Sequence, residues 1–524
     1  MGGTRGSAEG ERPRPRDRLA TPPATRARPP LSLVVFVVGA ASLGSEIGAA
    51  RLLAPYFGAS TTVWANTIAV VLLALSTGYW LGGSLADKLP NRRHLHGVVL
   101  AAAVALAVVP FVARPFLSAT VSALDATSTG AVIGSLVGVL LLVAGPVMLL
   151  GAVAPYAIRL ATTDIGRSGT TAGRLYAIST AGSLVGTFLA ALVLLPFAGT
   201  QRTFLVFAAA LAAVACLGLR RRYALAALGV AALIAIPPGQ TKAAPPGERV
   251  IWEDETPYQY ARVVEDRADG DRRLELNEGL AVHSLYRPGS YLTRDYWDEF
   301  LVLPSAALPR PPRRVAILGN AGGTTARAYG HYFPATAIDG VEIDGELTGV
   351  ARRFFDMRAP RLRMHTADAR PFLRGARERY DAIFIDAYRQ PYIPFYLATR
   401  EFFDLARERL AAGGVVVVNV GHPPGESRLE KALAATMRAA FPVVLRDASE
   451  PTNTLLVGSA APVSRGALAR RARTLPPDLR PIAAAAARRL APPLPGGEVL
   501  TDDRAPVEWL IDRSIVEYAA HGGR

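Results

Sequence analysis

The chain has 524 residues and a formal net charge of +15; half of its residues are hydrophobic and only 19% are charged. With a mean hydropathy of +0.23, this composition excludes an ordinary soluble protein of this size. Its one cysteine, Cys216, excludes an internal disulfide framework and a cysteine-rich metal site, and we expect no metal.

Residues 1–30 form a Pro/Arg-rich segment without a packable pattern, which predicts a disordered basic tail. Much of the net charge lies here and in short loops between apolar segments. A basic patch for nucleic acid is therefore not needed to explain the charge, and we expect no nucleic-acid partner.

Residues 31–237 are nearly all Ala, Leu, Val and Gly, which predicts a transmembrane helical domain in the lipid bilayer of the cell membrane. Small residues in TGYWLGGSLAD (77–87) and STAGSLVGTFLAA (179–191) predict tight helix contacts. Gly145-Pro146 predicts a kink, and Glu46 with Arg51 is interpreted as an ion pair near a helix end. We expect about seven spans, at 31–50, 63–86, 96–117, 131–158, 174–197, 203–219 and 223–237.

Arginine and lysine are concentrated in the tail and in the segments 87–94, 159–174 and 220–223. The positive-inside rule then predicts a cytoplasmic N-terminus. Seven spans would place the C-terminal domain outside the cytoplasm, whereas six or eight would place it inside.

A Pro/Gly-rich linker is predicted at 238–250, followed by a small β unit at 251–303. From Arg314 onward, within the domain 304–524, short apolar strands alternate with helical segments. This alternation predicts a doubly wound, mainly parallel sheet. The expected fold is thus a multi-span α-helical membrane domain followed by an α/β Rossmann-like domain with a small β unit at its N-terminal side.

A glycine loop, Gly319-Asn320-Ala321-Gly322-Gly323, follows the first strand of this domain, and acids end the next three strands at Glu342, Asp368 and Asp386. Glycines allow a ligand to approach the backbone closely, and an acid about 20 residues further on can hold a ribose diol. Helix capping alone explains three such acids poorly. Because the spacing lacks a diphosphate fingerprint, it favours an S-adenosylmethionine-type ligand over NAD.

These residues resemble the spermidine/spermine synthase family over about 251–460, and the whole layout resembles its membrane-fused bacterial members. The motifs TPYQYARV, VEID and TADA carry the resemblance. It implies a class I methyltransferase-type fold and transfer of an aminopropyl group from decarboxylated S-adenosylmethionine to a diamine. It also implies that the donor is contacted by Gln259, Gly319, Gly322, Gly323, Glu342 and Asp368.

The segment DAYRQPYIP departs from the family, because Arg389 or, with a gap, Gln390 stands where a second aspartate is expected, and Tyr296-Trp297-Asp298 stands where the family has Tyr-His-Glu. An arginine stays protonated, so it would repel a diamine and attract a carboxylate or phosphate. We therefore predict an altered site, with Asp386 as the base and Tyr388 lining the pocket. Alternatively, Arg389 pairs with Asp386, Asp502 or Asp503 and orders the loop. Negative charge could also come from Glu278, Asp298 and Glu299.

Two functions follow. The first is a membrane-anchored transferase that uses decarboxylated S-adenosylmethionine or S-adenosylmethionine and a small-molecule amine or other nucleophile, as a monomer or a homo-oligomer. The second is a non-enzymatic transporter or sensor; a methyltransferase is a further alternative. Because S-adenosyl donors are expected in the cytoplasm, we expect the C-terminal domain there, against the simple span count.

Overall fold

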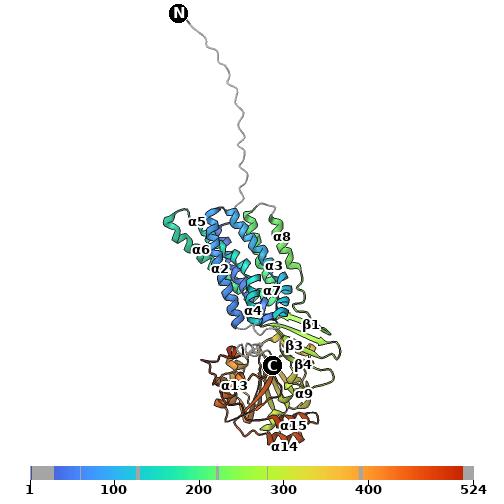
Figure 1. The fold of residues 1–524 in the computed structure, drawn as a ribbon. Helices are drawn as coiled ribbons and strands as arrows, with labels where there is room; N and C mark the ends of the chain where they lie inside the picture. The colour runs from blue at the N-terminus through green and yellow to red at the C-terminus, as the bar shows by residue number, and fades with distance from the viewer. Residues whose placement is uncertain are drawn as a thin grey trace.

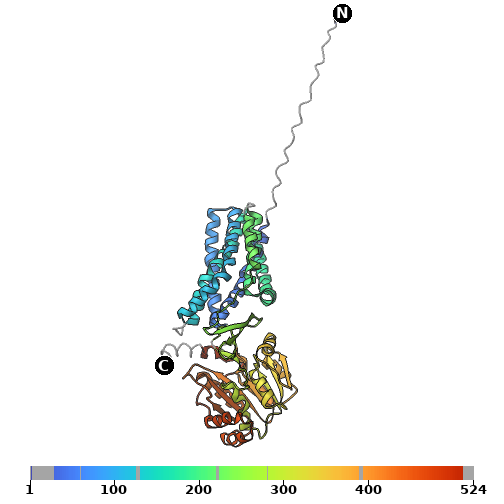
Figure 2. The same ribbon diagram turned by 90° about the vertical axis from the view of Figure 1, so that its right-hand side faces the viewer.

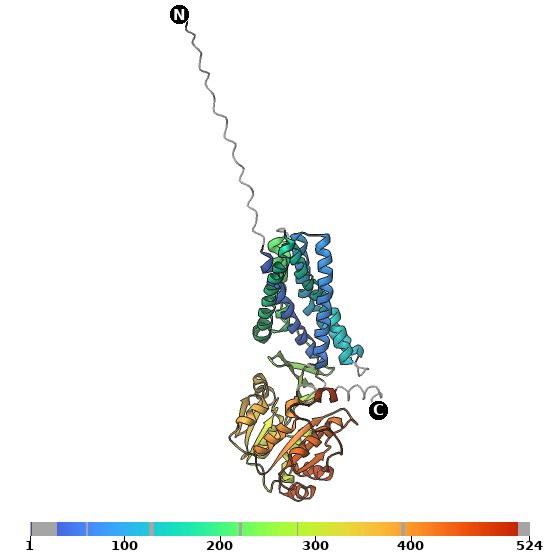
Figure 3. The ribbon, with the colours of Figure 1, turned by 90° about the vertical axis from the view of Figure 1, so that its left-hand side faces the viewer.

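The computed structural model describes residues 2, 29–58, 61–124, 130–219, 223–279, 281–388 and 393–511, and the side chains among them except those of 122–124 and 130–132. A helical bundle, a small β unit and an α/β domain follow one another along the long axis of the molecule (Figures 1–3). This order matches the predicted division of the chain.

The bundle contains five helical segments that are long and apolar enough to cross a membrane, by length and composition: 31–57, 61–88, 92–121, 144–161 and 165–218, in the part of the chain described. Shorter apolar helices lie at 133–142 and 224–235. The elements are α1 (Leu31–Phe57), α2 (Thr61–Lys88), α3 (Arg92–Leu124), α4 (Gly130–Leu142), α5 (Ala144–Ala161), η1 (Ile165–Arg167), α6 (Ser168–Leu189), η2 (Ala190–Leu194), α7 (Leu195–Gly218), α8 (Ala224–Ala232) and η4 (Leu233–Ala235).

Small residues bring pairs of these helices into backbone contact, as the sequence predicted. A Cβ on Gly82 of α2 would lie 2.3 Å from the carbonyl oxygen of Ala152 of α5. On α6, a Cβ on Gly186 would lie 2.1 Å from the carbonyl oxygen of Ala40 of α1. No side chain fits at these positions, so glycine is what lets the helices approach each other this closely.

Two breaks interrupt the long apolar segments of the bundle. The fourth span separates into α4 and α5 at Val143, because Pro146 has no N–H to donate to the carbonyl of Leu142. The long apolar segment 165–218 reverses direction at Gly199, whose φ of 78° is in the left-handed region. It therefore makes two passes through the bundle, which the sequence had separated correctly into two spans.

With α4 and α5 taken as one pass and the segment 165–218 as two, the described helices traverse the bundle seven times. Accordingly, α1 begins at the end far from the α/β domain and α8 ends near it (Figure 1). Contacts to the β unit and the α/β domain come from the near end, at Arg51, Tyr56, Thr61 and Thr200. At the far end, Asp87 and Arg159 form an ion pair of 2.9 Å. The basic segments 87–94 and 159–174 therefore lie at the far end.

The β unit is a four-stranded antiparallel sheet in the order β1-β2-β3-β4. Its strands are β1 (Glu248–Glu255), β2 (Tyr260–Asp266), β3 (Arg272–Leu276) and β4 (Val282–Tyr286). The first strand lengthens the unit beyond the prediction and shortens the linker, which ends before Glu248 instead of at 250. Two short 3-10 helices follow the β unit, η5 (Tyr296–Leu301) and η6 (Leu303–Ala306).

The main sheet has seven strands in the order β10-β11-β9-β8-β5-β6-β7, with β5 to β9 parallel and β11 antiparallel to its neighbours. Strand order reverses between β5 and β8, which is where such sheets bind ligands at their carboxyl edge. The strands are β5 (Arg314–Leu318), β6 (Ala337–Glu342), β7 (Leu362–Thr366), β8 (Tyr380–Ile385), β9 (Leu410–Gly421), β10 (Val443–Asp447) and β11 (Asn453–Ser459).

Helices cover both faces of this sheet and enclose two apolar cores. They are α9 (Thr324–Tyr332), α10 (Gly345–Phe354), α11 (Ala369–Gly375), η7 (Phe395–Leu397), α12 (Arg400–Glu408), α13 (Arg428–Ala440), α14 (Arg465–Arg471), η8 (Ala472–Thr474) and α15 (Leu479–Arg489). The segment 501–510 belongs to the domain, as predicted, since the Asp502 carboxylate pairs with Arg370 at 2.6 Å.

The odd number of passes predicts that the N-terminal segment, at the far end of the bundle, and the α/β domain, at the near end, lie on opposite sides of a membrane. In a Cys216→Ser background, Ser168→Cys at the far end and Asp503→Cys in the α/β domain both replace exposed residues. A membrane-impermeant thiol reagent added to intact cells should label one of them and spare the other. Labelling of both, or of neither until the cells are opened, would contradict seven passes.

Candidate active site

A cavity of about 520 Å³ lies between the carboxyl edge of the main sheet, the β unit and the near end of the bundle. Gln259, Gly319, Glu342, Asp368, Asp386 and Tyr388, which the sequence proposed from separate motifs, all line it. Its size is within the range of small-molecule sites. The topology thus gathers residues that are up to about 130 positions apart in the sequence around one space.

The glycine loop forms the floor of this cavity. Gly319 has a φ of 86°, and a Cβ there would lie 2.5 Å from the Cα of Ala387, so only glycine fits. Gly322 and Gly323 lie behind the cavity wall: the Gly322 N–H donates to Ser284 Oγ at 2.8 Å, and Gly323 packs against Met357. The structure gives these two glycines a role in shaping the loop, while Gly319 faces the cavity.

Glu342 ends β6 and faces the loop. Its carboxylate accepts the Ala321 N–H at 2.8 Å and the Asp344 N–H at 3.0 Å. Burial raises its pKa to about 7, against the lowering effect of these donors. Each carboxylate oxygen keeps a lone pair after one such bond, so Glu342 can still accept from the hydroxyls of a ligand.

Asp368 and Gln259 stand at either side of Glu342. Asp368 caps α11 through the Arg370 N–H at 2.9 Å, and its other oxygen accepts from Tyr396 Oη at 2.6 Å. Gln259 is buried, and its backbone is held by Thr256, whose hydroxyl donates to Asp344. Asp368 therefore both caps a helix and lines the cavity, although the sequence presented these two roles as alternatives.

Asp386 follows β8 and is the most strongly organised acid of the site. Its carboxylate accepts from Asn419 Nδ2 at 2.8 Å, Tyr296 Oη at 3.1 Å and Trp297 Nε1 at 3.1 Å. Burial raises the pKa of Asp386 to about 7, while these three donors act in the opposite direction. An acid with this pKa can exchange a proton near neutral pH.

A chain of amides orients this carboxylate. Asn453 Nδ2 of β11 donates to Asn419 Oδ1 of β9 at 2.9 Å, which turns the Asn419 NH₂ group toward Asp386. Tyr388 Oη donates to the Asn419 carbonyl at 2.9 Å and accepts the Gly421 N–H at 2.6 Å. Burial holds the pKa of Tyr388 far above its usual value, so it remains a neutral hydroxyl.

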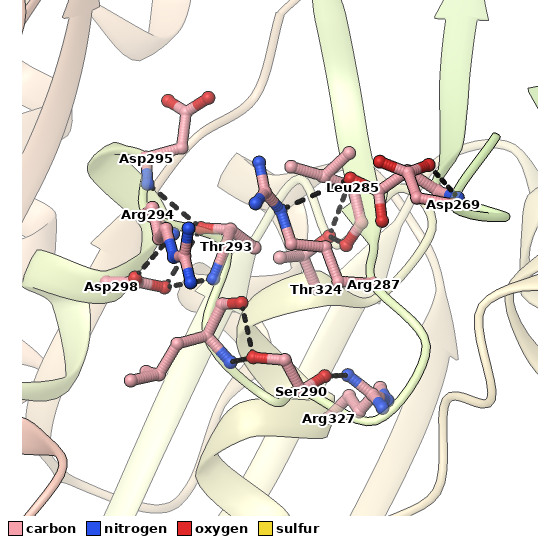
Figure 4. Close-up of polar contacts among 12 residues, drawn as sticks. Asp269, Leu285, Arg287, Ser290, Thr293, Arg294, Asp295, Asp298, Thr324 and Arg327 are labelled. Carbon is pink, nitrogen blue, oxygen red and sulfur yellow. Dashed lines mark hydrogen bonds and ion pairs between the residues drawn. The ribbon is translucent and has the colours of Figure 1, made fainter. Parts of the chain in front are cut away.

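The sequence predicted no role for Tyr296 and Trp297. The acid after them, Asp298, accepts the Thr293 and Arg294 N–H groups, both at 2.8 Å, and so fixes the turn before η5 (Figure 4). From this turn both rings donate to the Asp386 carboxylate. The signal in the sequence was a tryptophan, in place of the expected histidine, at the central position of Tyr296-Trp297-Asp298. An indole N–H can only donate, so it fits beside a carboxylate.

The other proposed acids have different partners. Asp298 is used in the turn just described, and Glu299 pairs with Arg489 at 2.7 Å. Glu278 is buried at the junction with α1, where Gly58 lies against its carboxylate. Arg389 lies outside the described residues, so its predicted pairing stays a prediction; of its suggested partners, Asp502 pairs with Arg370.

The bundle supplies part of the cavity wall, which the sequence gave no reason to expect. Arg51 of α1 lines the cavity and donates to the carbonyl oxygens of Thr256, at 3.2 Å, and Pro257. These bonds fasten α1 to the β unit, and the ion pair of Arg51 with Glu46 stays a prediction. Only the docked arrangement of the two domains reveals this role.

Comparison with known proteins agrees with this geometry. Residues 299–459 match the family model of the spermine/spermidine synthase domain. A probable polyamine aminopropyl transferase of Bifidobacterium longum is 33% identical over 296 residues, covering 52% of this chain and 65% of that protein. Polyamine aminopropyltransferase of Vibrio vulnificus is 31% identical over 197 residues, covering 37% of this chain and 65% of that protein.

Two further similarities differ in extent. Polyamine aminopropyltransferase 1 of Ralstonia nicotianae is 28% identical over 462 residues, covering 80% of this chain and 81% of that protein. The crystal structure of a probable spermidine synthase from Corynebacterium glutamicum is 22% identical, covering 50% of this chain and 97% of that chain, with a TM-score of 0.37.

The C-terminal part of the chain therefore contains a spermine/spermidine synthase domain, and the predicted resemblance is confirmed. The chain spans 65% of the length of the Bifidobacterium and Vibrio relatives. The similarity to the Ralstonia protein covers too much of this chain to be confined to the α/β domain, so it includes part of the helical bundle.

The buried acid at the domain junction predicts a pH-dependent stability. Burial raises the pKa of Glu278 from 4.5 to about 7, and among the described residues its carboxylate oxygens have no hydrogen-bond partner. The folded chain holds this proton more tightly than the unfolded chain, so stability falls as the pH rises from 4.5 to about 7. Glu278→Gln should reduce this pH-dependent loss in the free energy of unfolding by up to about 3 kcal/mol.

The measurement is the melting temperature of the detergent-solubilised chain across a pH series. Glu278→Gln should melt above the parent at pH 8 and close to it at pH 4.5. The exposed Glu498, replaced in the same way, is the control and should leave the difference between the two pH values unchanged. An equal shift of Glu278→Gln at both pH values would contradict a buried titrating carboxylate.

Proposed function

We propose that this protein is a membrane-anchored aminopropyltransferase that uses decarboxylated S-adenosylmethionine as donor and an amine as acceptor. The observation that carries the proposal is the Asp386 carboxylate, held by three donors in a cavity that Glu342 and Asp368 also line. The spermine/spermidine synthase domain supports the same reaction class, as do relatives named polyamine aminopropyltransferase.

In this proposal the residues at the ends of β5, β6 and β7 bind the donor. Gly319 lets the adenosyl portion lie against the backbone, Glu342 accepts from the ribose hydroxyls, and Asp368 accepts from the adenine amino group. Gln259 closes the same side from the β unit. No metal is involved in this scheme, and the reaction depends on placing two reactants in line.

Asp386 then serves the acceptor. The lone pair of the amine attacks the methylene carbon attached to the sulfonium, the carbon–sulfur bond breaks, and methylthioadenosine leaves as a neutral thioether. Asp386 accepts the proton that the new secondary ammonium releases. Tyr296, Trp297 and Asn419 keep the carboxylate ionised and oriented until that step.

Two arguments about the side of the membrane disagree. The need for an S-adenosyl donor favours the cytoplasmic placement predicted from the sequence. The seven passes, with the basic segments at the far end, favour the opposite side. The labelling experiment on Ser168 and Asp503 separates these placements, because it reports which of the two positions faces outward.

Loss of the proposed base should abolish turnover but spare donor binding. Asp386→Asn should lower the rate of methylthioadenosine release by at least about 100-fold, the usual contribution of a general base. Methylthioadenosine should still raise the melting temperature of the variant, since Glu342 and Asp368 are intact. Parent-like turnover in Asp386→Asn would rule out its role as base.

The pH profile tests the same group. Because the ionised form is needed and the pKa of Asp386 is about 7, kcat/KM should rise with pH and level off above about 7. Trp297→Phe removes a donor that stabilises the carboxylate, so it should move the midpoint to higher pH. An unmoved midpoint would mean that another group titrates.

The donor is identified by comparing the concentrations at which different ligands stabilise the chain. A ligand at 100 times its dissociation constant stabilises the folded chain by about 2.7 kcal/mol. Decarboxylated S-adenosylmethionine should stabilise the full-length chain at lower concentration than S-adenosylmethionine does. The reverse order would support a methyltransferase, and no shift with either would support the non-enzymatic alternative.

A further inference from the structure

The candidate cavity has two chemically different walls. The sheet side carries the acids Glu342, Asp368 and Asp386. Apart from Arg51, the bundle side is apolar, with Ile47, Ala50 and Ala54 of α1 and Trp64 of α2. Acids and hydrogen-bond acceptors bind the amines of a small diamine, and its short methylene chain needs little apolar surface, so this wall has room for a larger, partly apolar acceptor.

Exposed apolar side chains gather at this end of the α/β domain and β unit. The large apolar side chains that the described part of these two units leaves exposed are Tyr258, Ile343, Phe395, Val499 and Trp509, at 37–56% exposure. Tyr258, Ile343 and Phe395 line the cavity, and Trp509 follows Glu508, which also lines it. Aromatic side chains of this kind are enriched where proteins meet the membrane–water interface.

The depth of the cavity agrees with that interface. α1 has 27 residues and is apolar enough to span, whereas about 20 helical residues cross the hydrocarbon core. If the core begins at Leu31, it ends near Ala50, among the residues that line the cavity. Trp64 lies one turn inside α2 at the same end, and it is 42% exposed.

A positive charge lies at the same level. Arg51 lines the cavity, next to the apolar wall, and its guanidinium is fixed by the carbonyl oxygens of Thr256 and Pro257. A guanidinium attracts phosphate and repels a free diamine. The cavity therefore offers an apolar wall, a cation and, at the sheet, the Asp386 carboxylate.

We propose that the acceptor is the primary amine of a phospholipid headgroup, which enters the cavity from the membrane interface past Trp64. This rests on the proposed aminopropyl transfer at the same site. Arg51 attracts the phosphate, the acyl chains stay beside α1 and α2, and the headgroup amine reaches Asp386. The amine gains the aminopropyl group through a new carbon–nitrogen bond, methylthioadenosine leaves, and Asp386 takes the proton, so atoms and charge balance.

The test uses the full-length chain in nanodiscs, where both membrane faces are accessible, with decarboxylated S-adenosylmethionine as donor. Nanodiscs contain phosphatidylcholine alone or mixed with phosphatidylethanolamine; the quaternary amine of the former has no lone pair. Soluble phosphoethanolamine and putrescine are added to phosphatidylcholine discs in separate arms. Methylthioadenosine release and the mass of the extracted lipid are measured.

Phosphatidylethanolamine should support release at least ten-fold faster than either soluble amine at equal amine concentration, and an aminopropylated lipid should form. Fast turnover of putrescine with inert phosphatidylethanolamine would overturn the lipid acceptor and leave the proposed function standing. Preference for soluble phosphoethanolamine would assign a phosphorylated amine without a membrane source and would also overturn it. No release with any of the three amines would overturn the proposed function together with it.

Variants separate the lipid wall from the donor site. Trp64→Ala should lower turnover of the lipid about ten-fold or more, with the stabilisation by methylthioadenosine unchanged. Trp80→Ala is the matched control, because Trp80 is on the same helix, far from the cavity, and is 72% exposed. Equal effects of the two variants would mean that Trp64 acts only through the membrane, and would contradict entry past it.

Discussion

The docking of the helical bundle onto the β unit and the α/β domain is the constraint on which the proposed site depends. Polar contacts from the near end of the bundle make this connection: Arg51 to Thr256 and Pro257, Thr61 to Glu508, and Thr200 to Glu255 at 2.8 Å. In addition, Tyr56 donates to Thr241 in the linker. They come from the ends of several different helices. The orientation of the domain is therefore set by the whole bundle, not by one flexible linker.

This docking gives the cavity its closed side. The carboxyl edge of a doubly wound sheet is open to solvent in the absence of a covering element. Here α1 and α2 cover it, so water is partly excluded from the acids that line the cavity. The raised pKa values of Glu342 and Asp386 have the same physical origin, because burial penalises their ionised forms.

The sequence predicted the parts of this structure that depend on local pattern. Alternating apolar strands and helices, the glycine loop and the acids at strand ends were all read correctly, because each strand is short, apolar and followed by its own turn. The helix contacts at Gly82 and Gly186 were also predicted, since small residues at regular spacing have few other uses in an apolar helix. The first strand of the β unit was missed, because Glu248–Glu255 carries four acids and lacks apolar alternation.

The site residues that escaped prediction act across domains or through one another. Asn419 contacts Asp386 only because β8 and β9 are neighbours in the sheet, and Arg51 reaches the cavity only because two domains pack together. Neither relation leaves a motif in one stretch of sequence. The hydrogen-bonded turn around Asp298, which aims Tyr296 and Trp297, is likewise visible only in three dimensions.

The bond between Asn453 and Asn419 has a consequence for the chemistry at Asp386. An amide side chain is nearly symmetric in shape, so Asn419 could present either its oxygen or its NH₂ group to the carboxylate. The NH₂ group of Asn453 occupies the oxygen side and removes that choice. Residue 453, which does not touch the carboxylate, thereby favours its ionised form: with Asn419 reversed, an oxygen would face Asp386 and favour the protonated form. Burial remains the largest influence on the pKa of the proposed base, and β11, one strand further away, lowers it through this amide.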